Sequence, residues 1–151
     1  MQASVTAAPV RGTRKLNAAI ALLALAGIAA SSVSLYHHFS KSKTSFCDMG
    51  KSFNCDLVNR SQYSVVRGVP VALVGILGYL FLLSLATVYR EKAETPFMLA
   101  AAALVGLGFA LYLTYIEGVV LHAWCVVCLS SLGLISAIAI LSVYQATKAL
   151  R

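Results

Sequence analysis

Charged residues are scarce in this sequence. They make up 11% of its 151 residues, whereas a soluble domain usually has about a quarter. Hydrophobic residues make up 60%, and this composition excludes an ordinary soluble protein. A helix that crosses a bilayer needs about 20 apolar residues, and suitable stretches occur at 16–36, 69–89, 96–117 and 124–144. The sequence therefore predicts an all-α integral membrane protein, a bundle of four transmembrane helices with one long extracytoplasmic loop between the first two.

Few residues remain outside these stretches, so there is no room for a second, soluble domain. We expect residues 1–15 to form a disordered cytoplasmic tail, 16–146 the membrane domain, and 147–151 a second cytoplasmic tail. The loop 37–68 holds most of the polar residues. The first apolar stretch is longer than the core of a signal peptide, which is about 7–15 residues, so we expect a retained anchor.

Acidic residues are also few, 5 against 12 basic ones, which gives a net charge of +7. In a soluble protein this charge would suggest nucleic acid as a partner, but basic residues flank membrane helices as orientation signals, and we expect no nucleic acid. Four spans place the N-terminus, the second connection and the C-terminus on one side with seven basic residues, against five in the loop. This balance modestly favours cytoplasmic termini and, in a bacterial inner membrane, a periplasmic loop.

The sequence has only four cysteines, and they form two pairs. Cys47 and Cys55 lie in the polar loop, whereas Cys125 and Cys128 form a Cys-x-x-Cys motif at the start of the last predicted helix. The four-span topology places both pairs on the same, non-cytoplasmic side. Because the N-terminus of a helix stabilises a thiolate, we expect Cys125 to exchange with other thiols. Cys128, one turn deeper, would face a lipid-soluble electron acceptor, most plausibly a quinone.

This layout suggests a relay for electrons. Thiol–disulfide exchange moves two electrons at each step, and they would pass from a partner dithiol to the loop pair, then to the Cys-x-x-Cys pair, then to the quinone. A zinc site is disfavoured because the loop spacing is wider than usual, and no metal is expected. Covalent haem attachment is excluded because Leu129 follows the motif where histidine is needed. A non-enzymatic membrane scaffold with structural disulfides stays open as an alternative.

The motifs resemble the vitamin K epoxide reductase family, in its bacterial disulfide-forming branch without a fused thioredoxin domain. The resemblance covers most of the chain. It rests on a cysteine followed by aspartate twice in the loop, on the stretches NRSQYSVVRGVPVALVGILGYL and YLTYIEGVVLHAWCVVC, and on the order of the four cysteines. Other four-helix, quinone-linked thiol oxidases place their Cys-x-x-Cys in the first external loop instead.

The resemblance implies a four-helix bundle around a quinone, either ubiquinone or menaquinone, and an enzyme that supports disulfide bond formation. Cys47 would take electrons from a separate thioredoxin-fold protein, Cys55 would pass them to Cys125, and Cys128 would react with the quinone. The alternative is a quinone or vitamin K epoxide reductase whose useful product is the reduced quinone. Val71 and Leu132 stand where animal members have asparagine and tyrosine, which favours plain quinone reduction over epoxide chemistry.

Further residues are candidates for the quinone pocket or for support of the cysteines. The two tyrosines of the third apolar stretch fit either a pocket wall or an aromatic belt at the membrane surface. Glu117 is a candidate to handle a proton and His122 to support a thiolate, although either residue can simply lie at the interface or in a turn. The predicted quinone pocket comprises Ser61, Val71, Tyr79, Tyr112, Tyr115 and Leu132.

Overall fold

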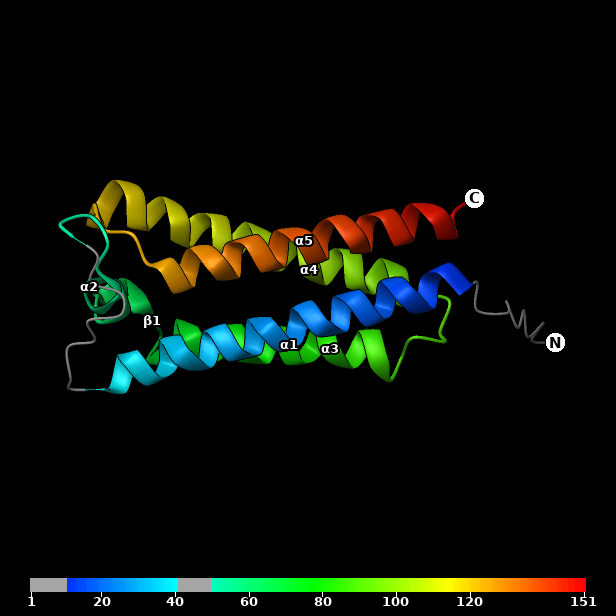
Figure 1. Cartoon of the computed structure of the whole chain (residues 1–151), viewed down its shortest axis with the longest axis horizontal. Coiled ribbons are helices and arrows are strands. Elements are labelled where there is room, and N and C mark those ends of the chain that lie inside the picture. The colour runs from blue at the N-terminus through cyan, green and yellow to red at the C-terminus, as the bar shows by residue number, and fades with distance from the viewer. Residues whose placement is uncertain (1–10, 41–49) are drawn as a thin grey trace.

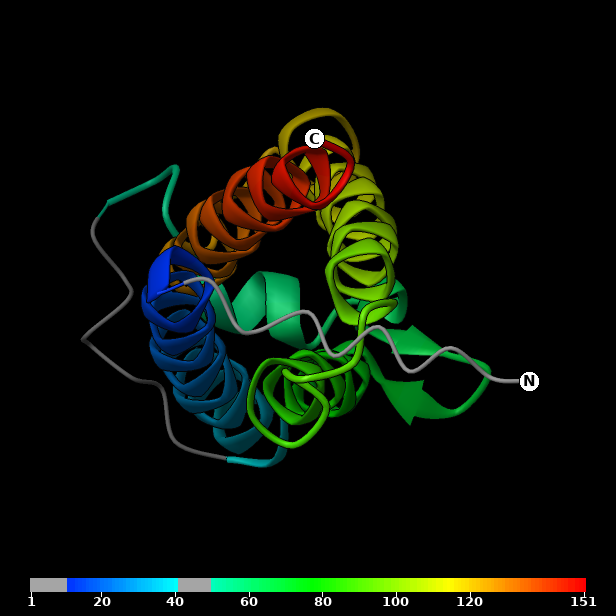
Figure 2. The same cartoon turned by 90° about the vertical axis from the view of Figure 1, so that its right-hand side faces the viewer.

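Four long helices lie side by side in the computed structural model, which describes residues 11–40 and 50–151 (Figure 1). Seen from the end, they surround a common centre (Figure 2). Helix α1 packs against α3 and α5, and α5 packs against α4, whereas α3 and α4 contact each other much less. The four helices are α1 (Arg11–Phe39), α3 (Val71–Thr87), α4 (Thr95–Tyr115) and α5 (Val126–Ala149).

The described residues include three helices that are long and apolar enough to cross a membrane, Thr13–Phe39, Thr95–Leu121 and Val126–Ala149. Helix α3 is equally apolar but shorter, at 17 residues. Large apolar side chains point outward on all four helices, where only lipid can cover them without cost. The protein is therefore a mostly helical integral membrane protein.

Small side chains allow the helices to pack closely. Ala24, Ala103 and Ala139 are buried in the core between larger residues such as Ile138, and small residues let helix backbones approach each other in lipid. Gly27 of α1 lies directly under the ring of Tyr79 from α3. This close contact fixes α1 against α3.

Helix α1 begins at Arg11, five residues before the predicted start at residue 16. Residues 11–15 are thus helical and do not belong to a disordered tail, while the rest of that predicted tail lies outside the described residues. A membrane helix can continue past the hydrocarbon layer because basic side chains such as Arg14 and Lys15 extend into the headgroup region. The same helix continues to Phe39, three residues past its predicted end.

The polar loop 37–68 contains elements that its sequence did not predict. The short helix α2 (Cys55–Asn59) is followed by a 3₁₀ turn, η1 (Gln62–Ser64), and by the hairpin of β1 (Val65–Val66) and β2 (Val69–Pro70). The strands pair antiparallel across a two-residue turn, in which Arg67 and Gly68 both have positive φ, 51° and 85°. Such turns match the twist of a tight hairpin.

At its end, α4 continues as a π-helix, η2 (Ile116–Leu121), which stops at His122 in the left-handed conformation with φ of 50°. A short extended segment then leads into α5. The start of α1 and the end of α5 lie at one end of the bundle, and α2 lies with the start of α5 at the other (Figure 1).

Candidate functional site

Two cysteines that are 70 residues apart in sequence meet at this second end of the bundle. The sulfur atoms of Cys55, at the start of α2, and Cys125, just before α5, are 3.4 Å apart. Both side chains are buried, at 1% and 0% exposure. Cys55 is disulfide-bonded, whereas Cys125 and Cys128 are free thiols. A free thiol therefore lies next to an oxidised sulfur, at the separation from which reacting atoms approach each other.

Backbone hydrogen bonds hold these two cysteines together. The N–H of Asn54 donates to the carbonyl of Trp124 at 3.1 Å, and the N–H of Trp124 donates to the carbonyl of Ser52 at 2.9 Å. These bonds form a short parallel bridge between the residues that precede each cysteine. The side chain of Asn54 also caps α2 by accepting from the N–H of Leu57 at 2.9 Å. The segment 52–54 thereby places Cys55 against Cys125.

Cys125 is the N-cap residue of α5, and its sulfur accepts a hydrogen bond from the N–H of Cys128 at 3.4 Å. Its pKa is lowered, chiefly by a hydrogen bond from the Cys128 thiol and also by the N–H groups of Cys128 and Val127. Burial and the negative charge of Glu117 act in the opposite direction without reversing the shift. Cys125 is therefore more easily ionised than an ordinary thiol, and the thiolate is the nucleophile in exchange.

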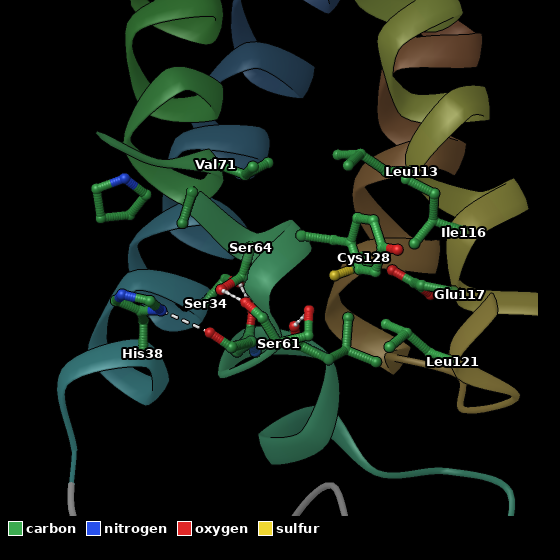
Figure 3. A pocket seen from close by; sticks show the side chains of 15 residues that line it. Ser34, His38, Ser61, Ser64, Val71, Leu113, Ile116, Glu117, Leu121 and Cys128 are labelled. Carbon is green, nitrogen blue, oxygen red and sulfur yellow. Dashed lines mark hydrogen bonds between the residues drawn. The ribbon is translucent and has the colours of Figure 1, made fainter. Parts of the chain in front are cut away.

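Glu117 brings a carboxylate to both thiols. It is 3% exposed, and its Oε2 atom accepts a hydrogen bond from the N–H of Cys125 at 3.2 Å. Figure 3 shows the Glu117 carboxylate beside the side chain of Cys128, with which it forms a side-chain hydrogen bond. Within 11–40 and 50–151 no Lys, Arg or His forms an ion pair with Glu117. Placing an ionisable group within a membrane costs free energy, and such groups usually have a function. Glu117 is therefore a candidate for proton transfer.

A large cavity of about 780 Å³ opens inside the bundle next to Cys128 and Glu117. This volume lies within the range of about 300–1,000 Å³ typical of ligand sites. Its walls are almost entirely apolar and come from all four long helices, so the cavity suits a lipid-soluble ring with part of an apolar tail. Much of this space exists because several residues of α3 and α4 that line it have small side chains or none. These residues are Gly75, Gly78, Ala101, Ala102 and Gly106.

A second, smaller cavity of about 60 Å³ adjoins the first beneath α2 and η1. Figure 3 shows its walls, with Ser34 and His38 from α1 facing Cys128 and Glu117 across it. The two cavities abut, since five residues line both, namely Ser34, Val71, Leu113, Glu117 and Cys128. The free thiol that faces a ligand in this space is Cys128.

The structure places only some of the predicted pocket residues at these cavities. Tyr79 lines the large cavity, and its hydroxyl donates to the backbone carbonyl of Ser131 at 3.0 Å. Val71 lines both cavities, and Ser61 lines the small one. Cys47 lies outside the described residues.

Tyr112 and Tyr115 line neither cavity and are 58% and 61% exposed. Leu113 of α4 and Glu117 of η2 face inward, and helical spacing turns the two tyrosines of α4 away from that face. Leu132 of α5 also lies outside both cavities, and His122 is exposed in its left-handed turn. The tyrosines thus face outward, where an aromatic belt would lie.

A cluster of polar side chains on α1 and α2 was not predicted from the sequence. Ser34 donates its hydroxyl to Oδ1 of Asn59 at 2.7 Å, and Nδ1 of His38 lies 2.5 Å from the carbonyl oxygen of Asn59. Ser34 and His38 are four residues apart and so lie on one face of α1, whose sequence is otherwise largely apolar. That spacing was the available signal for a polar stripe facing the loop.

Among the described residues, no three His, Cys, Asp or Glu side chains lie close enough together to hold a metal ion. The model of the Vitamin K epoxide reductase family matches residues 18–143. The match runs from α1 into α5 and includes the whole arrangement of Cys55, Cys125, Cys128 and Glu117.

Proposed function

The chain belongs to the vitamin K epoxide reductase family, whose members are membrane oxidoreductases, and from this we propose a specific activity. The protein oxidises a separate thioredoxin-fold partner and passes the electrons through two cysteine pairs to a quinone, thereby supporting disulfide bond formation. We further propose that it is of the bacterial, disulfide-forming type of the family. The observation that carries the proposal is the 3.4 Å approach of Cys55 to Cys125 beside a cavity that exposes Cys128.

The relay begins at the loop pair. A partner thiolate attacks the Cys47–Cys55 disulfide, and the partner leaves oxidised while the loop pair becomes two thiols. The Cys55 thiolate then attacks Cys125 of an oxidised Cys125–Cys128 pair, and Cys128 leaves as a thiolate. Cys47 resolves the resulting mixed disulfide, so the loop disulfide re-forms and Cys125 is released. Each exchange moves one electron pair and conserves the number of S–S bonds.

The last step regenerates the Cys125–Cys128 disulfide. The two thiols lose two electrons and two protons, and the quinone gains both to become a hydroquinone. Glu117 lies where it can accept a thiol proton and return it to the quinone oxygen, because its carboxylate faces Cys128 from inside the cavity wall. The apolar walls hold the ring against Cys128 and exclude bulk water.

The quinone is ubiquinone or menaquinone, and the cavity supports either. Its volume of about 780 Å³ accommodates a quinone ring and the first part of an isoprenoid tail. Val71, which lines both cavities, offers no side-chain donor or acid that would assist epoxide opening. These features favour plain quinone reduction over a role in which epoxide is the substrate.

The membrane topology of the proposal has four spans. Helix α3 is 17 residues long, which corresponds to about 25 Å, just enough for a span. Lys92 lies over the ring of Tyr89 and Lys148 over that of Tyr144, at the end of the bundle where α1 begins. This end is proposed to be cytoplasmic, and the cysteines then lie on the periplasmic side of a bacterial inner membrane.

The proposal is tested with the purified protein in lipid nanodiscs, given a reduced thioredoxin-fold protein and ubiquinone or menaquinone. Hydroquinone formation is followed by ultraviolet absorbance. Cys125→Ser and Cys128→Ser should abolish it, whereas Cys47→Ser should block the protein partner but leave a small dithiol able to reduce Cys125–Cys128 directly. A parallel reaction with quinone epoxide as the substrate distinguishes the proposed function from the alternative of an epoxide reductase, which would reduce the epoxide.

Three results would contradict the proposal. Turnover that survives in Cys128→Ser would remove that thiol from the quinone step. Failure to trap a disulfide between residues 55 and 125 in Cys128→Ser would break the relay, and a protein with no turnover at all would support a scaffold with structural disulfides.

A further inference from the structure

Asn59 has a buried side-chain amide, and among the described residues only its oxygen has a hydrogen-bond partner. Its side chain is 6% exposed at the end of α2, one turn after Cys55. The Oδ1 atom accepts a hydrogen bond from Ser34, whereas the Nδ2 atom has no acceptor among the described residues. A buried donor without a partner costs about 1–3 kcal/mol. Such a group indicates a partner outside the described residues.

Contacts with α1 fix the direction of this amide. Ser34 holds the side-chain oxygen at 2.7 Å, and Nδ1 of His38 donates to the backbone carbonyl of the same residue at 2.5 Å. Asn59 lines the small cavity with its oxygen turned to α1, and its NH₂ group is the half of the amide that has no partner among the described residues. The amide is thus oriented before any ligand binds.

The hydroxyl groups around the small cavity already have acceptors. Ser34 donates to Asn59, Ser61 to the carbonyl of Val58 at 2.8 Å, and Ser64 to the carbonyl of Ser61 at 2.7 Å. The phenol of Tyr63 is at the outer rim, where this residue is 39% exposed. Among the buried amide and hydroxyl groups of this wall, Nδ2 of Asn59 is the donor that remains available.

The same cavity wall contains Cys128 and Glu117, the groups that face the acceptor in the proposed reaction. We propose that Nδ2 of Asn59 donates a hydrogen bond to one carbonyl oxygen of the quinone bound against Cys128. This inference rests on the proposed function and adds the residue that recognises the quinone head. As the carbonyl gains electrons, its oxygen becomes negative, and a fixed donor stabilises that charge.

The position of Asn59 also links the two ends of the relay. Cys55 is the first residue of α2 and Asn59 is the last, so the same docked helix places a sulfur against Cys125 and an amide at the small cavity that adjoins the large one. A bound quinone should therefore favour the docked position of α2. Trapping of the disulfide between residues 55 and 125 should increase when quinone is present.

The test compares Asn59→Leu, which removes the donor, with Asn59→Asp, which keeps an acceptor for Ser34 but loses the NH₂ group. In both variants kcat/KM for quinone should fall about 10- to 100-fold. The double variant Asn59→Leu with Val71→Asn, which places an amide elsewhere in the same cavity wall, should recover part of the loss. Ser34→Ala keeps the donor and should have a smaller effect.

Two direct readouts separate recognition of the quinone from a structural role. The infrared carbonyl stretch of bound, ¹³C-labelled quinone should move to higher frequency in Asn59→Leu, because a hydrogen bond is lost. The quinone-dependent increase in trapping between residues 55 and 125, measured in a Cys128→Ser background, should disappear in Asn59→Asp.

An unchanged carbonyl stretch and an unchanged KM in both variants would overturn the role of Asn59, even if the wild-type protein reduces quinone. If the wild-type protein neither reduces nor binds quinone, the proposed function fails together with this inference. A variant that loses trapping even without quinone would assign Asn59 to the docking of α2 alone and would also contradict the inference.

Discussion

At the scale of single residues, Cys125 is the centre of the site. Its sulfur lies 3.4 Å from that of Cys55 and accepts the N–H of Cys128 at 3.4 Å. Its own N–H is held by Glu117. One atom therefore contacts the outer disulfide, the inner thiol and the helix terminus that stabilises its charge. In the proposed relay Cys125 both attacks and is attacked, which needs these contacts together, and its burial keeps the thiols of other proteins away from it.

The carboxylate of Glu117 is predicted to move a proton during quinone reduction. Glu117→Gln keeps an acceptor for the N–H of Cys125 but removes the basic group, so hydroquinone formation should fall about 10²- to 10⁴-fold, the usual range for losing a general acid–base group. Stopped-flow absorbance measures this step. Trapping of the disulfide between residues 55 and 125 serves as the control and should be unaffected, whereas wild-type rates of quinone reduction in Glu117→Gln would exclude the role.

The lowered pKa of Cys125 predicts a defined pH dependence. Since the hydrogen bond from the Cys128 thiol is the main cause of the shift, Cys128→Ala should move the rise in Cys125 reactivity to higher pH. Cys128→Ser, which keeps a hydroxyl donor, should move it less. The rate of mixed-disulfide formation with a small aromatic disulfide, measured against pH, reports the midpoint. An identical midpoint in wild type and Cys128→Ala would contradict this origin of the shift.

At the scale of elements, helix ends build the site. Helix α2 is capped by Asn54 and bridged to Trp124, so its first residue faces the start of α5. The π-helix η2 and the left-handed turn at His122 return the chain from α4 to α5 within a few residues. Irregular turns of this kind often occur at functional sites. Here the turn places Glu117 beside the Cys-x-x-Cys motif.

Close packing of α1 on α3 predicts that Gly27 is intolerant of a side chain. A Cβ atom at Gly27 would overlap the ring of Tyr79, whose hydroxyl ties α3 to Ser131 of α5. Gly27→Ala should lower the free energy of unfolding by about 1–3 kcal/mol, as overpacking does.

Gly133→Ala is the matched control, because nothing lies within 4 Å of an added Cβ there. It should leave stability unchanged or raise it by up to about 1 kcal/mol. Denaturation in detergent micelles measures both variants. Equal stabilities would show that the Tyr79 ring moves aside without cost.

At the scale of the whole molecule, the bundle holds the described cysteines at the end opposite to the start of α1 and the end of α5. The described start of α1 and the end of α5 share one end, and Cys55 and Cys125 lie together at the other (Figure 1). Between them the cavity is lined by all four helices and lies where α3 and α4 contact each other least. Lipid-soluble ligands thus have space inside the bundle, and soluble thiols have access only at the cysteine end.

This architecture predicts the topology in a bacterial membrane. A cysteine introduced by Arg151→Cys should react with a membrane-impermeant maleimide only after the cells are opened. A second one introduced by Lys51→Cys should react in intact cells, because it lies in the loop next to Cys55. Both substitutions are made in a variant that lacks the four native cysteines. Labelling of both positions from the same side would contradict the arrangement of the spans.

The sequence by itself determined the class of the protein and the position of its Cys-x-x-Cys motif. Four apolar stretches in so weakly charged a chain can be stable only in a membrane, and the Cys-x-x-Cys motif was predicted to open the last helix, where Cys125 indeed caps α5. The family predicted from the motifs is confirmed by the match over residues 18–143. These conclusions depend on composition and local spacing, which the sequence states directly.

Tertiary structure alone decided which side chains share the site. Helical periodicity did not reveal that α4 turns Tyr112 and Tyr115 outward, because α4 is apolar on every side and offers no polar face to orient it. The partners of Asn59 come from a helix about 20 residues earlier, and Cys55 meets Cys125 across 70 residues. Contacts at such separations arise from packing and from loop closure, and no local pattern in the chain records them.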